Sequence, residues 1–410
     1  MQADPAVRAA PLDRKVRIII AGLGVTQIIG WGSTYYLLTI LGSPMSAALD
    51  LPPALVSGGM SLLLVLGGLT GPFAGRFMDR RGARPGMAAG SIIAAAGLAL
   101  LSQAVGPVSY IVAWFVIGLS ASLILYPAAF TALTQAAPQN ARRAITLLTL
   151  PGGLASTVFW PLTSHLMPLF DWREICLIYA GLNLCVCLPI HLLLLPTRAG
   201  GLPSTATQAS ADSEGLPPAA QRRAFVLFAA MLALNALLVT GMLNQIMVLL
   251  TGLGQPAEQA VLFAMIFGIS QLSARMVDIL AAHRTDALRT GVAVMTGFCL
   301  ALAGLLVAGA SPVAGLLFAV LFGASNGILT IIRGTLVLQL FGITGYGEKL
   351  GTITVAQGIA GASGPVLIAL FLETFGPGTT VTACMGIAVL GLLAMLALYR
   401  HVMASRRMVS

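Results

Sequence analysis

Two charged side chains stand three residues apart in the apolar segment QLSARMVDIL, residues 271–280: Arg275 and Asp278. The planar guanidinium of arginine suits a carboxylate or a phosphate, and an aspartate in apolar surroundings can be held in its protonated form. A third charge, Arg333, lies in the similarly apolar GILTIIRGTLVLQL. Two cations and one carboxylate leave an excess of positive charge, so these residues predict an anion-binding site in which Asp278 couples binding to a proton.

A structural role for the same charges remains open. Arg275 and Asp278 are spaced to share one helix face, where they can pair while the site is empty. Arg333 could instead close a salt bridge with Asp278 between two helices.

Uncharged polar and aromatic side chains are further candidates for substrate contact. Gln27, Trp31 and Tyr35 recur at four-residue spacing, which places them on one helix face. The remaining candidates are Tyr126, Asn244 and Asn326. Each of them could equally join helices, which is a frequent role of polar groups in membranes.

The elements that must position these residues are membrane helices. The chain has 410 residues, of which 58% are hydrophobic and 9% charged, against about 25% charged in soluble domains. Apolar runs of about 20 residues recur without the alternation that a β-barrel requires. We therefore predict an all-α membrane protein with twelve transmembrane helices. The expected spans are 17–41, 54–75, 86–105, 107–135, 144–170, 173–196, 223–252, 257–282, 287–309, 312–340, 347–373 and 377–401.

The twelve helices divide into two pseudo-symmetric bundles of six. GPVSYIVAWFVIGLS (106–120) aligns with SPVAGLLFAVLFGAS (311–325) at an offset of 205 residues, which pairs Gly118 with Gly323. Repeated six-helix halves are typical of secondary transporters, with the substrate site between the halves. The expected division is an N-terminal tail at 1–16, a first bundle at 17–196, a flexible linker at 197–222, a second bundle at 223–401 and a C-terminal tail at 402–410.

The repeat also measures the depth of the charges. It aligns Asp79, at the end of the second helix, with Arg284. Arg275 then lies about 13 Å from that membrane boundary and Asp278 about 9 Å. The helix 4 counterpart of Arg333 puts it roughly 15 Å deep. In a hydrocarbon core near 30 Å thick, both arginines approach the midplane.

The distribution of charge predicts the orientation. Most of the 22 lysines and arginines fall in loops on one side of the twelve-helix layout, whereas the opposite side receives Arg173 alone. The positive-inside rule places both termini in the cytoplasm of a multi-pass protein of the cell membrane, the inner membrane in a bacterium. The net charge of +9 therefore reflects membrane topology and gives no reason to expect a nucleic-acid partner.

Between the second and third predicted helices stands GRFMDRRGARPG, residues 75–86. An aspartate near a helix end can meet basic groups or the positive N-terminus of a partner helix, and glycines permit a tight turn. The pattern resembles the signature loop of the major facilitator superfamily, G-x-x-x-D-R-x-G-R-[RK], with Ala83 where the family has a basic residue. The resemblance implies the major facilitator fold and a cytoplasmic gate that stabilises the outward-facing state. The matching residues are Gly75, Asp79, Arg80, Gly82 and Arg84.

A finer resemblance involves helices 1 and 5. GWGSTYYL and ARRAITLLTLPGGLASTVFWPLTSHL, followed by FDWR, are similar to the branch that contains bacterial monocarboxylate transporters and oxalate–formate exchangers. In that branch an arginine of helix 8 engages the substrate carboxylate, and Arg275 is the matching residue. Helix 1 and the interior of helix 11 lack the second cation that some members carry, which disfavours a dicarboxylate.

Together these features predict a secondary active transporter that works by alternating access. The favoured substrate is a small organic anion, a monocarboxylate, moved by proton symport or anion exchange; the alternative is a proton-coupled efflux pump for drugs or toxic metalloids. No phosphate-binding loop, nucleophile motif or metal-ligand cluster occurs, so we expect neither an enzyme nor a bound cofactor. We expect an ion gradient, of protons, to drive transport. The expected partners are the substrate and the lipid bilayer, and the expected state is a monomer. A receptor that does not transport would leave the buried charges without a purpose.

Overall fold

The computed structural model describes residues 12–197, 215–281, 286–308 and 310–407, and all regular secondary structure in these ranges is helical. The α-helices are α1 (Arg14–Ser33), α2 (Leu37–Leu49), α3 (Pro53–Arg81), α4 (Ala83–Ser102), α5 (Pro107–Ile124), α6 (Tyr126–Ala136), α7 (Ala141–Gly153), α8 (Ala155–Leu166), α9 (Trp172–Leu182), α10 (Leu188–Leu194), α11 (Pro218–Gly252), α12 (Ala257–Ala281), α13 (Ala287–Ala308), α14 (Pro312–Phe341) and α15 (Tyr346–Arg407). A 3-10 turn, η1 (Pro138–Asn140), precedes α7, and a π-helical turn, η2 (Asn183–Cys187), joins α9 to α10.

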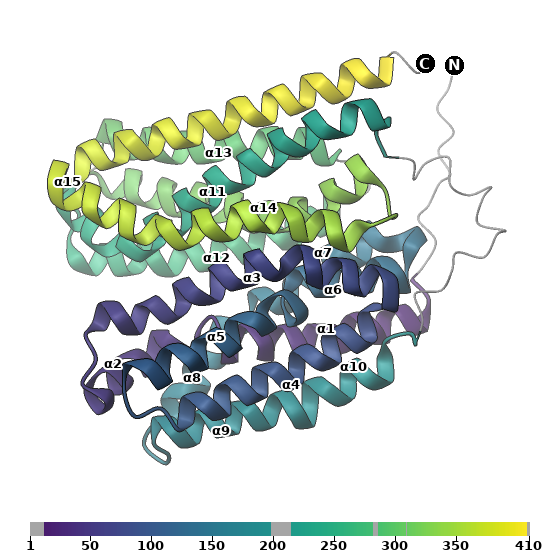
Figure 1. Cartoon of the computed structure of the whole chain (residues 1–410). Coiled ribbons are helices and arrows are strands. Elements are labelled where there is room, and N and C mark those ends of the chain that lie inside the picture. Colours follow the sequence, from purple (N-terminus) through teal and green to yellow (C-terminus); the bar gives the residue numbers. More distant parts are fainter. Residues whose placement is uncertain (1–11, 198–214, 282–285, 309, 408–410) are drawn as a thin grey trace.

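The helices form two bundles that lie side by side, α1–α10 in one and α11–α15 in the other (Figure 1). Eleven helical segments of the described ranges are long and apolar enough to cross a membrane. The last of them, α15, turns at Gly376, whose φ of 77° favours glycine. Because this turn separates two membrane-length stretches, α15 supplies the last two of the twelve predicted crossings.

Several crossings are interrupted where one continuous helix was predicted. The first breaks at residues 34–36, between α1 and α2, and the fourth breaks at Leu125, just before Pro127. The fifth breaks at Leu154, three residues after Pro151. A proline removes a backbone donor and clashes with the preceding turn, which explains the break just before Pro127.

Three predicted boundaries differ from the helix ends, because the helices extend further than the apolar runs do. The motif at 75–86 was expected to be a loop, but α3 continues to Arg81 and α4 begins at Ala83. Only Gly82 is non-helical there, with φ 90°. The expected linker lies largely outside the described residues, and its end at residue 222 falls within α11; α15 likewise continues past the predicted residue 401.

The internal repeat is visible in the packing. Pro107 and Pro312 both begin a helix. A β-carbon placed on Gly118 would contact the carbonyl oxygen of Leu62, and one on Gly323 would overlap that of Phe267. The two partners are related by the same offset of 205 residues, so equivalent helices meet at equivalent glycines in the two bundles.

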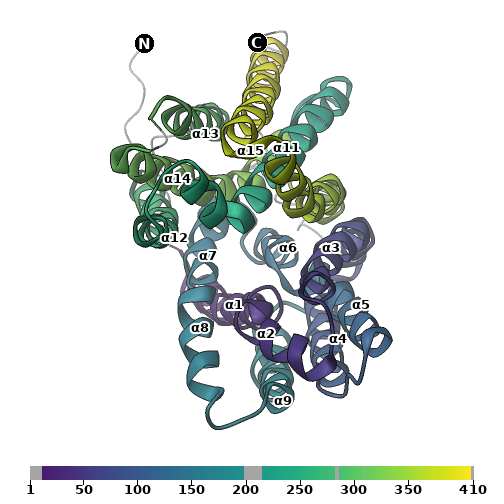
Figure 2. The same ribbon diagram turned by 90° about the vertical axis from the view of Figure 1, so that its left-hand side faces the viewer.

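The bundles meet along two seams, which Figure 2 shows end-on: α3 packs against α15, while α7 packs against α12 and α14. The first seam is built on glycine. A β-carbon on Gly71 or Gly75 would overlap the backbone of α15 at Gly351 or Gly347, and the reverse substitutions would overlap α3. Small residues at this spacing let two membrane helices approach to backbone contact.

Gly351→Ala should weaken this seam, because its new β-carbon would overlap the carbonyl of Gly71. Overpacking of this kind costs about 1–3 kcal/mol. The ratio of molecules in which α3 and α15 are in contact to molecules in which they are apart should therefore fall about tenfold. The measurement is the spin-label distance between the exposed positions Phe73 and Ile359 after the native cysteines are replaced. Gly386→Ala is the matched control, since nothing lies within 4 Å of its β-carbon; equal distance distributions in both variants would contradict the prediction.

Candidate functional site

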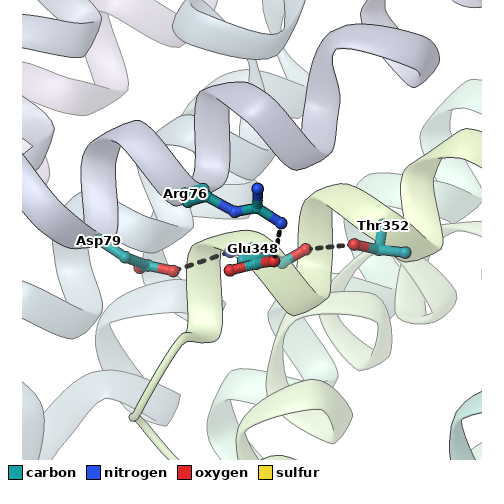
Figure 3. Close-up of polar contacts among 4 residues, drawn as sticks. All are labelled: Arg76, Asp79, Glu348 and Thr352. Carbon is teal, nitrogen blue, oxygen red and sulfur yellow. Dashed lines mark hydrogen bonds and ion pairs between the residues drawn. The ribbon is translucent and has the colours of Figure 1, made fainter.

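Asp79 fastens the end of α3 to the beginning of α15 (Figure 3). Its Oδ1 accepts a hydrogen bond of 3.0 Å from the backbone N–H of Gly347, and its Oδ2 one of 2.8 Å from that of Glu348. The first N–H groups of a helix have no partner within the helix and carry partial positive charge. Asp79 therefore holds the two bundles together by capping a helix of the opposite bundle.

An ion pair lies beside this cap. Arg76 Nη2 and Glu348 Oε1 are 2.5 Å apart, in an ion pair between the two bundles (Figure 3). The two side chains are 49% and 40% exposed, and exposed pairs contribute only about 0–1 kcal/mol. The motif residues Arg80 and Arg84 form no ion pair within the described ranges. Arg76 thus has the cationic role at this contact.

The turn at Gly82 is braced by Gln135 of α6. Its Oε1 accepts from Ala83 N–H at 2.8 Å, and its Nε2 donates to the carbonyl of Met78 at 3.0 Å. Sequence reasoning missed Gln135, Arg76 and Glu348. Glu348 carried a local signal, an acid in the first turn of a helix, but its partner lies far away in sequence and no spacing rule identifies it.

Arg275 occupies the second seam. It projects from α12, is 5% exposed, and donates to four neutral acceptors. Within its own bundle these are the carbonyl of Gly327 at 3.2 Å and the side chains of Gln271 and Thr330 at 3.4 and 3.3 Å. The fourth is the carbonyl of Thr149 on α7, 2.9 Å from Nη1. Arg275 therefore bridges the two bundles.

The pair expected between Arg275 and Asp278 is not formed in this structure, nor is one between Asp278 and Arg333. Asp278 is half-buried on α12, one turn from Arg275. The guanidinium reaches the carbonyl of Thr149 on α7, and Asp278 lies within electrostatic range of another residue of α7, Arg142. Tertiary packing therefore separates two groups that helical spacing alone would have allowed to pair.

A chain of aromatic side chains in the first bundle begins at the same carbonyl. Tyr126 donates its hydroxyl to Thr149 O at 3.3 Å. The Trp31 ring lies 5.3 Å from that of Tyr126 and 5.4 Å from that of Tyr35. The indole Nε1 of Trp31 is buried without a hydrogen-bond partner among the described residues. Three of the predicted contact residues thus form one aromatic wall beside Arg275.

Arg333 lies on α14, close to the same wall. Tyr126 is within electrostatic range of both Arg275 and Arg333. Arg333 Nη1 donates to Gln357 Oε1 at 3.1 Å, while its Nε is buried without a partner in the described ranges. The second seam therefore contains two guanidinium groups and, at Trp31 and Arg333, two unused N–H donors.

The other predicted contact residues lie in different surroundings. Gln27 is fully buried and donates to the carbonyl of Ile124 at 2.7 Å, which makes it a joint between helices. Asn244 is exposed and donates to Thr240 O at 3.3 Å. Asn326 is half-buried on α14, where its backbone carbonyl accepts a hydrogen bond from the Thr330 hydroxyl. The described residues contain no cluster of potential metal ligands.

Residues 23–342 match the sequence profile of the Major Facilitator Superfamily. The chain belongs to that superfamily. This major facilitator is accordingly a multi-pass secondary transporter of small molecules and not an enzyme.

Two proteins are similar to this chain in sequence, and one solved structure is similar to it in fold. An MFS-type transporter of Gibberella moniliformis is 23% identical over 341 residues, 80% of this chain and 77% of the relative. The multidrug resistance protein MdtH of Aeromonas salmonicida is 33% identical over 126 residues, 31% of each chain. The human organic anion transporter MFSD10 superposes with a TM-score of 0.70 and 17% identity over 94% of this chain and 100% of that one. At that identity the likeness shows the fold alone.

Asp79→Asn should open the contact between α3 and α15 more than Arg76→Gln does. The amide keeps one acceptor and turns a donor toward a backbone N–H, whereas the ion pair of Arg76 is solvent-exposed. Loss of a helix cap costs about 1 kcal/mol, or ~5-fold in the equilibrium. The spin-label distance between Phe73 and Ile359 measures the closed fraction. A larger effect of Arg76→Gln would show that the ion pair stabilises the contact between α3 and α15 more than the Asp79 cap does.

Proposed function

We propose that this major facilitator moves a small organic anion, a monocarboxylate, and that Arg275 binds its carboxylate. The observation that carries the proposal is a buried guanidinium at the bundle interface with four neutral acceptors and no carboxylate partner among the described residues. A charge in such surroundings is costly unless an opposite charge compensates it. An anionic substrate would supply that charge.

The position of Arg275 suggests how binding is linked to movement. Alternating access requires the two bundles to rock about the substrate site, so α7 must separate from α12 during the cycle. The bond from Arg275 to Thr149 O would break in that step. A carboxylate that accepts from the same guanidinium replaces the lost bond. Bound substrate therefore lowers the free-energy cost of separating α7 from α12.

The neighbouring residues fit an anion with a small apolar body. The unused N–H donors of Trp31 and Arg333 call for acceptors, and carboxylate oxygens are strong acceptors. The rings of Trp31, Tyr35 and Tyr126 offer apolar faces to the rest of the substrate. These contacts are consistent with the monocarboxylate and oxalate–formate branch of the superfamily, on which part of the proposal rests.

Asp278 is proposed as the proton carrier. It is the acid nearest to Arg275 in the sequence, lies one helical turn away and is half-buried, with Arg142 of α7 within electrostatic range. Protonation of its carboxylate would leave the two arginines to attract the anion without competition. We further propose a monomer in the cell membrane, the inner membrane in a bacterium, with both termini in the cytoplasm, as the distribution of basic residues indicates.

A second candidate function is proton-coupled efflux of drugs or toxic metalloids. The partial match to the multidrug resistance protein MdtH favours it. Efflux of lipophilic cations usually needs an accessible acid at the site. Here Arg275 and Arg333 outnumber Asp278, so the excess charge at the bundle seam is positive. Resistance of expressing cells to such compounds, without carboxylate uptake by the purified protein, would establish efflux instead.

Arg275→Gln should abolish carboxylate uptake. Loss of a buried charge contact costs about 3 kcal/mol, or ~100-fold in rate. The measurement is uptake of a set of labelled monocarboxylates into liposomes that contain the purified protein, under an inward proton gradient. Arg289→Gln, at an exposed position of α13, is the control for lost charge. Unchanged uptake in a folded Arg275→Gln protein would exclude Arg275 from the site.

Asp278→Asn should separate coupling from binding. The variant keeps the arginines but cannot take up a proton, so uptake driven by the proton gradient should fall at least ~10-fold while exchange of one anion for another persists. Both rates are measured in the same liposomes. Glu373→Gln, which removes an exposed acid of α15, should change neither rate. If both rates fall together in Asp278→Asn, the residue has a structural or binding role instead.

A further inference from the structure

An apolar groove of about 640 Å³ lies between α1 and α7, away from the seam between the bundles. This volume is within the range of about 300–1,000 Å³ that is usual for small-molecule sites. Its apolar lining comes chiefly from Ile20 and Ala21 on α1 and from Leu147, Leu150, Pro151 and Leu154 on α7.

The groove opens toward the surface that faces lipid. Ala21 is exposed, and so are Ile18 and Val25, at 47% and 42%. Their spacing of three and four residues places them on one stripe of α1. An apolar stripe exposed on a spanning helix is in contact with the hydrocarbon core, so the groove is accessible to acyl chains.

Two arginines also line the groove, Arg17 and Arg143. Arg17 lies in the first turn of α1 and Arg143 in the first turn of α7. The chain crosses the membrane four times between these starts, so both helices begin on the same side. The two guanidinium groups therefore lie at one end of the groove, at the depth of the lipid headgroups.

Neither guanidinium has a partner within the described residues. Their side chains form no hydrogen bond or ion pair there, and Asp13, at the N-cap of α1, does not pair with Arg17. Cationic groups at the membrane end of a groove between helices match the phosphate of an anionic lipid. A zwitterionic lipid has the same phosphate but no net negative charge, so it would compensate the two cations less completely. Free phosphate would leave the apolar part of the groove empty.

We propose that this groove is a binding site for one anionic phospholipid, with its phosphate on Arg17 and Arg143 and an acyl chain along Leu147, Leu150 and Leu154. The site is independent of the substrate, and the proposal stands whether the transporter moves a carboxylate or another compound.

Native mass spectrometry of the full-length protein, titrated with phosphatidylglycerol or phosphatidylcholine, tests the proposal. The wild type should retain one phosphatidylglycerol molecule and bind phosphatidylcholine at least ~10-fold more weakly. The double variant Arg17→Gln/Arg143→Gln should bind phosphatidylglycerol about 30-fold more weakly, as expected for the loss of two interfacial charges. Arg222→Gln/Arg223→Gln, at exposed positions in α11, removes the same charge and should bind like the wild type.

A second variant tests the apolar part and keeps both charges. Ala21→Trp fills the groove and should also weaken phosphatidylglycerol binding, at the same melting temperature. Equal affinity of the wild type for both lipids, equal losses in the two arginine pairs, or undiminished binding in Arg17→Gln/Arg143→Gln would each overturn the proposal. Displacement of the lipid by millimolar inorganic phosphate would overturn it too, because it would identify a phosphate site without an acyl-chain component.

Discussion

The position of Arg275 depends on how closely two backbones approach it. Its guanidinium reaches the carbonyls of Gly327 and Thr149. A β-carbon on Gly327 would overlap the backbone of Gln271, and one on Gly153 would overlap the guanidinium itself. A buried charge needs hydrogen-bond partners, and α12, α14 and α7 supply them at this spacing. Movement of the bundles must therefore change the surroundings of Arg275.

The two seams between the bundles differ in chemistry, but both consist of contacts weak enough to break and form again. Along α3 and α15, close backbone packing and the cap by Asp79 hold the bundles together without a buried ion pair. At α7 and α12, one arginine donates to one carbonyl. Contacts of a few kcal/mol suit a protein that must alternate between two arrangements, because a much stronger seam would make one state permanent. In the proposed cycle, the first seam resists separation of the bundles, and the bond at the second seam is exchanged for a bond to the substrate.

Much of this organisation could be predicted from residue order. The twelve crossings and the internal repeat follow from local patterns of apolar residues and glycines, and the structure confirms both. Helix ends were less accurate. The segment at 75–86 was predicted to be a loop because it is charged, yet phenylalanine, methionine and arginine all tolerate a helix, and only Gly82 interrupts it. Hydropathy reports where lipid ends, whereas a helix ends where its backbone hydrogen bonds do.

Sequence by itself determined the class of the protein, the presence of charges deep in apolar helices and the motif that joins α3 to α4, because each is a property of neighbouring residues. Tertiary structure alone decided the partners of those charges. Arg275 bonds to Thr149, 126 positions away, whereas the nearby Asp278 lies within electrostatic range of Arg142. Likewise Arg76, outside the predicted gate set, pairs with Glu348 across 272 positions. The physical reason is that a partner is selected by distance in space, and the packing of one bundle against the other sets that distance.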